Sequence, residues 1–334
     1  MKMDPVISLS EFALIERYFA PNATARATTT TAGVVLSVGD DAALLEVPAD
    51  QELVAATDTI VAGVHFPHTT DPRAIGHRAV AVNLSDLSAM GAKPRWLLLA
   101  LTLPSADADW LSRFAEGFHG LAARHGCALV GGDTTRGPLS ITVTALGTVP
   151  RGQALRRRGA RVGDALCLSG NIGDGAAGLR FMQGEFDSRR AGGRELVLRF
   201  LFPEPQVELG QTLRGVASAC IDISDGLVAD LGHLLAASGV GGTLDASALP
   251  HSVPFRIAVP EALQSALALT GGDDYELAFS CPPAQVAALA ADAARLGTRV
   301  TRIGTVEAAR GLRVSDGRGD PMPIDRPGHD HFVS

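Results

Sequence analysis

One short pattern recurs at the ends of the expected strands of this sequence: small residues beside one or two aspartates. It occurs as Gly39-Asp40-Asp41, Thr57-Asp58-Thr59, Gly131-Gly132-Asp133, Asp222-Ile223-Ser224-Asp225 and Gly271-Gly272-Asp273-Asp274. Neighbouring carboxylates repel one another and are costly to remove from water, whereas Mg²⁺ prefers carboxylate and phosphate oxygens as ligands. Glycine beside each aspartate lets the main chain turn sharply and approach a phosphate. The pattern therefore indicates a magnesium-dependent enzyme that acts on phosphates.

Each occurrence also has an ordinary structural interpretation. Gly-Asp pairs are common in turns and helix caps, and Asp40 and Asp41 could be one cap and one solvated neighbour. His65 could be a plain loop histidine, or it could contact substrate beside the metal site. Because the pattern recurs five times in one chain, we favour a shared function over five unrelated turns.

Local geometry places other polar groups beside these aspartates. Asp71 and Pro72 predict the start of a helix that stops at Gly91, and on it Asn83 and Asp86 share a face. Asp222 and Ser224 point to the same side of a strand, and the next residues turn into a helix whose N-terminus can face an anion.

The order of expected elements predicts an α+β protein of two mixed domains, residues 1–150 and 151–334. In the first we expect helices at 8–18, 71–90 and 106–125 and strands at 34–38, 43–47, 53–57, 96–103 and 139–149. In the second, strands and helices alternate from 165 to 304. The segment 151–161 carries five arginines and is expected to be a linker or mobile loop.

The charge balance argues against two classes of partner. A net charge of −7 does not suit nucleic acid or an anionic membrane, and the longest apolar runs are too short to span a bilayer. The four cysteines are scattered and form no CxxC pair, and acidic residues interrupt the N-terminal segment where a signal peptide would be apolar. We therefore expect a cytoplasmic protein.

Missing motifs exclude several common enzyme classes. The sequence has no GxxxxGK[ST] phosphate loop and no HExxH, GxSxG or kinase HRD…DFG set. A nucleotide would thus have to be held through the aspartates.

Read in order, the long strings around these aspartates resemble the thiamine-monophosphate kinase family, over nearly the whole chain. The strings that carry the resemblance are Gly39–Ala43, Thr57–Phe66, Ala81–Ala92, Gly131–Pro138, Ile221–Leu227, Gly271–Leu277 and Gly328–Phe332. The resemblance implies ATP-dependent phosphorylation of thiamine monophosphate to thiamine diphosphate, with several Mg²⁺ ions and ATP as co-substrate. It also implies two domains of the aminoimidazole ribonucleotide synthetase type, with the N-terminal domains pairing across a homodimer.

The family's functional residues transfer position by position. The implied metal ligands are Asp41, Thr57, Asp58, Asp86, Asp133, Asp222 and Asp225. The implied ATP contacts are Gly132, Asp133, Arg157 and Ser224. Because Arg156 and Arg158 are its direct neighbours, the match leaves open which of the three arginines contacts ATP. His65, Asp273 and His329 match the substrate site.

Two of these positions depart from the family. Asp273 replaces a glutamate, and His329 stands where an aromatic Tyr or Trp is common, so both could alter substrate affinity. No general base is expected, because the attacking phosphate oxygen is already an anion and the protein must mainly neutralise and align two polyanions. The alternatives are another ATP-using enzyme of the superfamily with a different acceptor, or a non-catalytic sensor of thiamine phosphates and nucleotide.

Overall fold

The computed structural model describes residues 11–19, 33–324 and 328. It divides into two compact units, one formed by residues 1–83 and 94–148 and the other by 84–93 and 149–334. The division falls inside helix α2, after Asn83. Each unit combines helices with a sheet, so the α+β prediction is confirmed.

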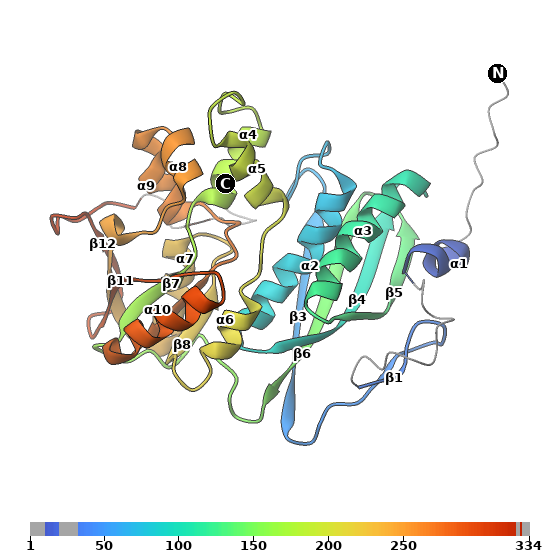
Figure 1. The fold of residues 1–334 in the computed structure, drawn as a ribbon, viewed down its shortest axis with the longest axis horizontal. Helices are drawn as coiled ribbons and strands as arrows, with labels where there is room; N and C mark the ends of the chain where they lie inside the picture. Colours follow the sequence, from blue (N-terminus) through green and yellow to red (C-terminus); the bar gives the residue numbers. More distant parts are fainter. Residues whose placement is uncertain (1–10, 20–32, 325–327, 329–334) are drawn as a thin grey trace. The chain divides into compact units, whose positions relative to one another are not determined.

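The first unit is built on a four-stranded sheet in the order β3-β6-β4-β5. Its strands are β3 (Gln51–Val61), β4 (Lys93–Leu103), β5 (Ala128–Arg136) and β6 (Ser140–Pro150). The helices α2 (Pro72–Ala89) and α3 (Ala108–Arg124) lie over one face of this sheet (Figure 1). A two-stranded sheet of β1 (Val34–Leu36) and β2 (Leu44–Leu45) and the turns α1 (Glu11–Leu14) and η1 (Ile15–Phe19) complete it.

The alternating burial of residues along the strands shows that one face of this sheet is covered. Ile141, Val143 and Ala145 of β6 are fully buried, whereas the residues between them are half-exposed, as a sheet covered on one face requires. The helices α2 and α3 approach closely where glycines meet: a Cβ at Gly76 would lie 2.1 Å from Phe114 O, and one at Gly117 would lie 1.9 Å from Arg73 O. Small residues at these crossings bring both helices down onto the sheet.

The second unit contains a six-stranded mixed sheet in the order β12-β9-β11-β7-β10-β8. Its strands are β7 (Ala165–Ser169), β8 (Ala219–Asp222), β9 (Gly241–Asp245), β10 (Leu277–Cys281), β11 (Val300–Glu307) and β12 (Gly311–Ser315). Only the pair β9 and β12 is parallel among these neighbours. Every residue of the central strands β7 and β10 is buried, because helices cover both faces.

The helices of this unit divide between the two faces of its sheet. One core contains residues of α4 (Asp174–Met182), α5 (Gly193–Leu201), α7 (Leu227–Ser238), α8 (Val253–Ala258) and α9 (Glu261–Thr270). The other contains residues of α6 (Val207–Thr212) and α10 (Val286–Arg295), together with three of the four cysteines, all free thiols. The 3₁₀ turns η2 (Ala246–Ala248) and η3 (Pro283–Gln285) join elements of this unit.

Most predicted elements are present, with shifted ends. The strand expected at 53–57 runs from Gln51 to Val61, because its period-two exposure continues past the aspartate. The start of the helix expected at 8–18 lies outside the described residues. Within the described part of the chain, no helix is both long and apolar enough to cross a membrane.

Candidate active site

The first group of predicted residues lies at the end of β3. The main-chain N–H of Asp58 donates to Asn83 Oδ1 at 3.0 Å, and the fully buried Asn83 donates in turn to Ala79 O of α2. Thr57 shares a hydrogen bond with Thr144 of the neighbouring strand β6 on the open face of the sheet. The helix thus holds the strand at the aspartate.

His65 lies in the turn that follows β3. The main-chain N–H of Val61 donates to His65 Nδ1 at 3.0 Å. Since Nδ1 accepts, the neutral imidazole carries its proton on Nε2, which makes that nitrogen a hydrogen-bond donor. A donor at this position suits a phosphate oxygen.

Gly132 and Asp133 lie in β5, where the chain passes close to β4. A Cβ at Gly132 would lie 1.9 Å from Leu99 O, and the φ angle of this residue is +153°, so only glycine fits there. Asp133 follows it with an exposed side chain. Asp41 is also exposed, and its main-chain N–H donates to the side chain of Asp40 at 2.9 Å.

A buried hydrogen bond links Asp222 to α2 in the second unit. Ser85 Oγ donates to Asp222 Oδ2 at 2.8 Å, and both residues are nearly inaccessible to solvent. Asp86 follows Ser85 on the same helical turn, with a partly exposed side chain. The bond therefore brings two of the predicted metal ligands to neighbouring segments.

Asp230 organises the turn that carries Ser224 and Asp225. Its Oδ2 accepts hydrogen bonds from the main-chain N–H groups of Ser224, Asp225 and Gly226, each at 3.1 Å. Burial, together with the charges of Asp222 and Asp225, raises the pKa of Asp230 to about 7 against the opposing effect of those donors. Asp222 and Asp225 therefore both lie near enough to Asp230 to disfavour its ionised form.

The segment of Asp273 pairs with this turn. The main-chain N–H of Tyr275 donates to Ile223 O at 2.8 Å, and that of Ile223 donates to Glu276 O, which extends the β8–β10 ladder. Asp273 and Tyr275 both have positive φ angles, +68° and +52°, and the Tyr275 hydroxyl donates to Asp273 Oδ1 at 3.1 Å. Such strained main chain is typical of functional sites.

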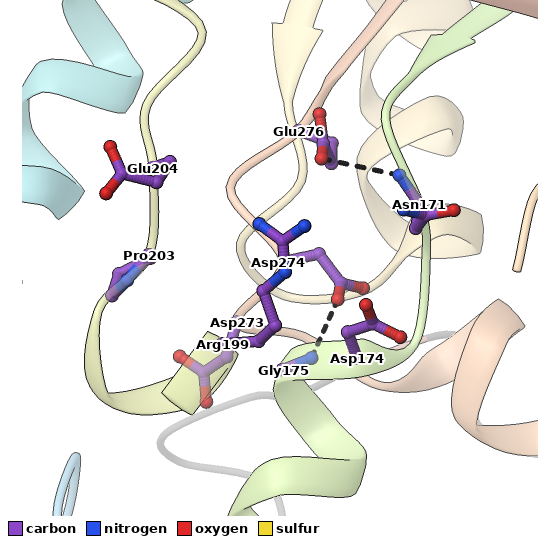
Figure 2. A pocket seen from close by; sticks show the side chains of 9 residues that line it. All are labelled: Asn171, Asp174, Gly175, Arg199, Pro203, Glu204, Asp273, Asp274 and Glu276. Atoms are coloured by element: carbon purple, nitrogen blue, oxygen red, sulfur yellow. Dashed lines mark hydrogen bonds between the residues drawn. The ribbon is translucent and has the colours of Figure 1, made fainter. Parts of the chain in front are cut away.

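Asp273 also lines a pocket of the second unit, with Arg199 and four further carboxylates: Asp174, Glu204, Asp274 and Glu276 (Figure 2). Asp274 accepts from Gly173 N and Gly175 N at 2.8 and 2.9 Å, at the start of α4. Burial raises its pKa well above the usual range. It also raises the pKa of Glu276 to about 7, although Ser169 and Asn171 donate hydrogen bonds to that carboxylate.

The arginine segment is tied to the body of the unit, contrary to the expected linker or mobile loop. Ser238 Oγ accepts from Gly159 N and Ala160 N, both at 3.1 Å, and donates to Arg157 O at 3.2 Å. Cys220 N donates to Arg156 O at 2.9 Å. The main chain is held while the side chains of Arg156, Arg157 and Arg158 stay exposed.

The predicted ligands fall into two sets by unit. Asp41, Thr57, Asp58 and Asp133 belong to the first unit, and Asp86, Asp222 and Asp225 to the second. Among the residues that the structure describes, no group of three or more His, Cys, Asp or Glu side chains could hold a metal ion by itself. His329 lies outside the described residues, but Gly328 before it packs on Asp225, since a Cβ there would lie 2.7 Å from Asp225 O.

Sequence reasoning missed the residues that hold these groups: Asn83, Ser85, Asp230, Ser238 and Tyr275. Only the shared helical face of Asn83 and Asp86 hinted at one of them. The others resemble ordinary polar residues of helices and loops.

Comparison with known proteins identifies the family. Residues 39–149 match the N-terminal domain of AIR synthase related proteins, and residues 161–317 match their C-terminal domain. The thiamine-monophosphate kinase of Salmonella typhimurium (strain LT2) is 44% identical over 331 residues, which cover 98% of this chain and 100% of the relative. The chain belongs to the thiamine-monophosphate kinase family.

Solved structures of thiamine-monophosphate kinases share the fold. The enzyme from Stenotrophomonas maltophilia K279a superimposes with a TM-score of 0.84 at 46% identity, covering 94% of this chain and 98% of that one. AaThiL complexed with AMPPCP and TMP superimposes with a TM-score of 0.76 at 30% identity, covering 99% and 100%. The resemblance expected from the sequence strings is confirmed.

Proposed function

We propose that the chain transfers the γ-phosphate of ATP to thiamine monophosphate, giving thiamine diphosphate and ADP. The observation that carries the proposal is full-length similarity to thiamine-monophosphate kinases, 44% identical over 98% of this chain. AaThiL, described in complex with AMPPCP and TMP, supports the choice of both substrates. The matched positions that the structure describes lie in strands β3, β5 and β8, in helix α2 and in loops.

We assign Mg²⁺ to the aspartates. The donor set fits a hard cation, because it is made of carboxylates and one hydroxyl. The proposed ligands are Asp41, Thr57, Asp58, Asp86, Asp133, Asp222 and Asp225. When bound, Mg²⁺ supplies neutralisation of phosphate charge.

The chain's own groups align the two substrates. Arg157, on its pinned segment, is proposed to pair with an ATP phosphate, and Gly132, Asp133 and Ser224 are proposed to contact the nucleotide. His65 is proposed to donate from Nε2 to the substrate phosphate, and Asp273 and His329 are proposed to contact the same substrate. No residue acts as general base, because the attacking phosphate oxygen is already ionised at neutral pH. Catalysis then rests on in-line alignment and charge.

We further propose a homodimer and a domain division at residue 150. The open face of the first sheet exposes Leu53 by 51% and carries Thr57 and Thr59, which suits pairing with a second copy. Sedimentation of the wild type and of Leu53→Asp tests this, since a dimer through that face should dissociate in the variant.

The four free thiols agree with a cytoplasmic location.

The deciding experiment is product analysis with ATP, Mg²⁺ and thiamine monophosphate, with free thiamine in a parallel reaction. We expect thiamine diphosphate and ADP in equal amounts, loss of both with EDTA, and no product from free thiamine. Binding of ATP and Mg²⁺ without thiamine diphosphate formation would refute the proposed acceptor and direct the search to other acceptors or a sensor.

A further inference from the structure

Three main-chain N–H groups in a row point at one carboxylate oxygen in the second unit. They belong to Ser224, Asp225 and Gly226, and each lies 3.1 Å from Asp230 Oδ2. Asp230 is 3% exposed and sits in the first turn of α7. Buried N–H groups require partners, and Asp230 supplies one acceptor for all three.

The N-cap residue of α7 makes no side-chain hydrogen bond to the helix start. Gly226 is the N-cap of α7 and has no side chain to bond the following N–H groups. Its φ angle is +132°, and a Cβ at this position would lie 2.9 Å from Thr270 O, so only glycine fits there. Asp230 therefore replaces the missing cap by reaching back over the residues that precede its own helix.

The turn that Asp230 holds follows one proposed metal ligand, Asp222, and contains another, Asp225. Asp222 ends β8, Asp225 lies three residues later, and the charges of both act on Asp230. The Ser85 hydrogen bond fixes the Asp222 side of the turn at 2.8 Å. Without Asp230, the three N–H groups would have to find water, and the course of the chain from Asp222 to Asp225 would loosen.

We propose that Asp230 is a positioning residue that shapes the Ser224–Gly226 turn so that Asp222 and Asp225 present their carboxylates for binding divalent cations. This inference rests on the proposed assignment of those two aspartates to Mg²⁺. Asp230 acts through the turn in this proposal, because its Oδ2 accepts from three main-chain donors of that turn.

Two variants separate the shape of the turn from its charge. Asp230→Ala removes the acceptor, whereas Asp230→Asn keeps an oxygen that can accept the same N–H groups and removes the charge. Asp164→Ala is the matched control: Asp164 is also buried and accepts a main-chain N–H, from Arg161 at 3.0 Å, but lies in a different turn.

Hydrogen exchange of the peptide covering residues 221–231 gives a readout that needs neither metal nor activity. We expect Asp230→Ala to speed exchange there at least about tenfold, with Asp230→Asn and Asp164→Ala close to wild type. Unchanged exchange in Asp230→Ala would overturn the positioning role, whatever the function of the protein. If Asp230→Ala does not fold, Asp230→Ser replaces it, because the shorter side chain cannot reach the three N–H groups; faster exchange than in the control supports the positioning role, and exchange equal to the control overturns it.

Mn²⁺ binding, followed by electron paramagnetic resonance, tests the consequence for the cation. We expect at least about tenfold weaker binding in Asp230→Ala and less than about threefold in Asp230→Asn, with no change in the control. Equal weakening in both Asp230 variants would assign the effect to charge and overturn the proposal. Wild-type Mn²⁺ affinity in both Asp222→Asn and Asp225→Asn would instead refute the assignment of these residues as metal ligands. The turn would then have no role in cation binding, but the exchange result on its shape would still hold.

Discussion

The main-chain N–H of Asp273 donates a hydrogen bond to the carbonyl oxygen of Ser224 at 2.9 Å. This bond joins the turn of the proposed metal and nucleotide contacts to the segment of the proposed substrate contact. A Cβ at Gly272 would lie 2.1 Å from the same carbonyl, so the approach depends on glycine. The two segments therefore form one rigid element, and a change in either is expected to affect the other.

Replacing Asp222 or Asp133 by Asn is expected to lower kcat at least about 100-fold while the fold persists. The amide keeps the shape but loses the charge that we assign to Mg²⁺, and in Asp222→Asn an oxygen can still accept from Ser85. Thiamine diphosphate formation and thermal unfolding measure the two effects. Asp245→Asn, at the cap of η2, is the control. Full activity of either variant at ordinary Mg²⁺ would remove that residue from the ligand set.

Ser238→Ala is expected to raise the KM for ATP about five- to tenfold. The hydroxyl accepts two main-chain N–H groups and bonds Arg157 O, so its loss frees the segment on which we place the phosphate-binding arginine. Steady-state kinetics with varied ATP checks this, and Mn²⁺ affinity should not change. Ser247→Ala, which breaks a hydroxyl bond to Asp245, serves for comparison. An ATP KM within twofold of wild type would show that this anchoring does not matter for binding.

Glu276→Gln is expected to flatten part of the pH dependence of stability. Burial raises the pKa of Glu276 from 4.5 to about 7, so the folded state binds this proton more tightly than the unfolded state. The stabilisation is fully present below pH 4.5 and is lost as pH rises through about 7, by up to about 3 kcal/mol.

Urea unfolding at pH 5 and pH 8 measures this effect. The wild type should lose more free energy of unfolding between the two pH values than Glu276→Gln loses. Asp230 and Asp274 have raised pKa values too, so the variant should keep some dependence of the same sign. Equal losses in the two proteins would contradict the role of Glu276.

Asp273→Asn is expected to raise the KM for thiamine monophosphate about tenfold with little change in the KM for ATP. Asparagine tolerates the +68° φ angle and its oxygen can still accept from the Tyr275 hydroxyl, so the loop should keep its shape while the charge is lost. Kinetics with each substrate varied in turn separates the two constants. Asp316→Asn, in an exposed turn that its side chain caps, is the control. Equal rises in both constants would point to a disturbed loop rather than a lost substrate contact.

Local patterns alone determined much of the fold. The alternation of strands and helices expected from residue 165 onward is observed, beginning with strand β7 and continuing through helix α7. The missed elements have weak local signals: β9 begins with Gly241 and Gly242, and α8 has only six residues, of which Val253 and Ile257 are exposed. Glycines form a strand there because β11 and β12 flank it, which is a long-range effect.

For the site, the sequence by itself determined which residue types could do the chemistry, because glycine–aspartate strings and their order are local features. Only the tertiary structure decided how these groups are held. In the sequence, Asp230 and Ser238 look like ordinary polar residues of one helix. Only in the folded chain do main-chain N–H groups donate to each of them. Ser224 and Asp273 are far apart in the chain. They meet through a main-chain hydrogen bond next to the paired strands β8 and β10. Hydrogen-bond partners of this kind depend on register and packing, which no short window of sequence contains.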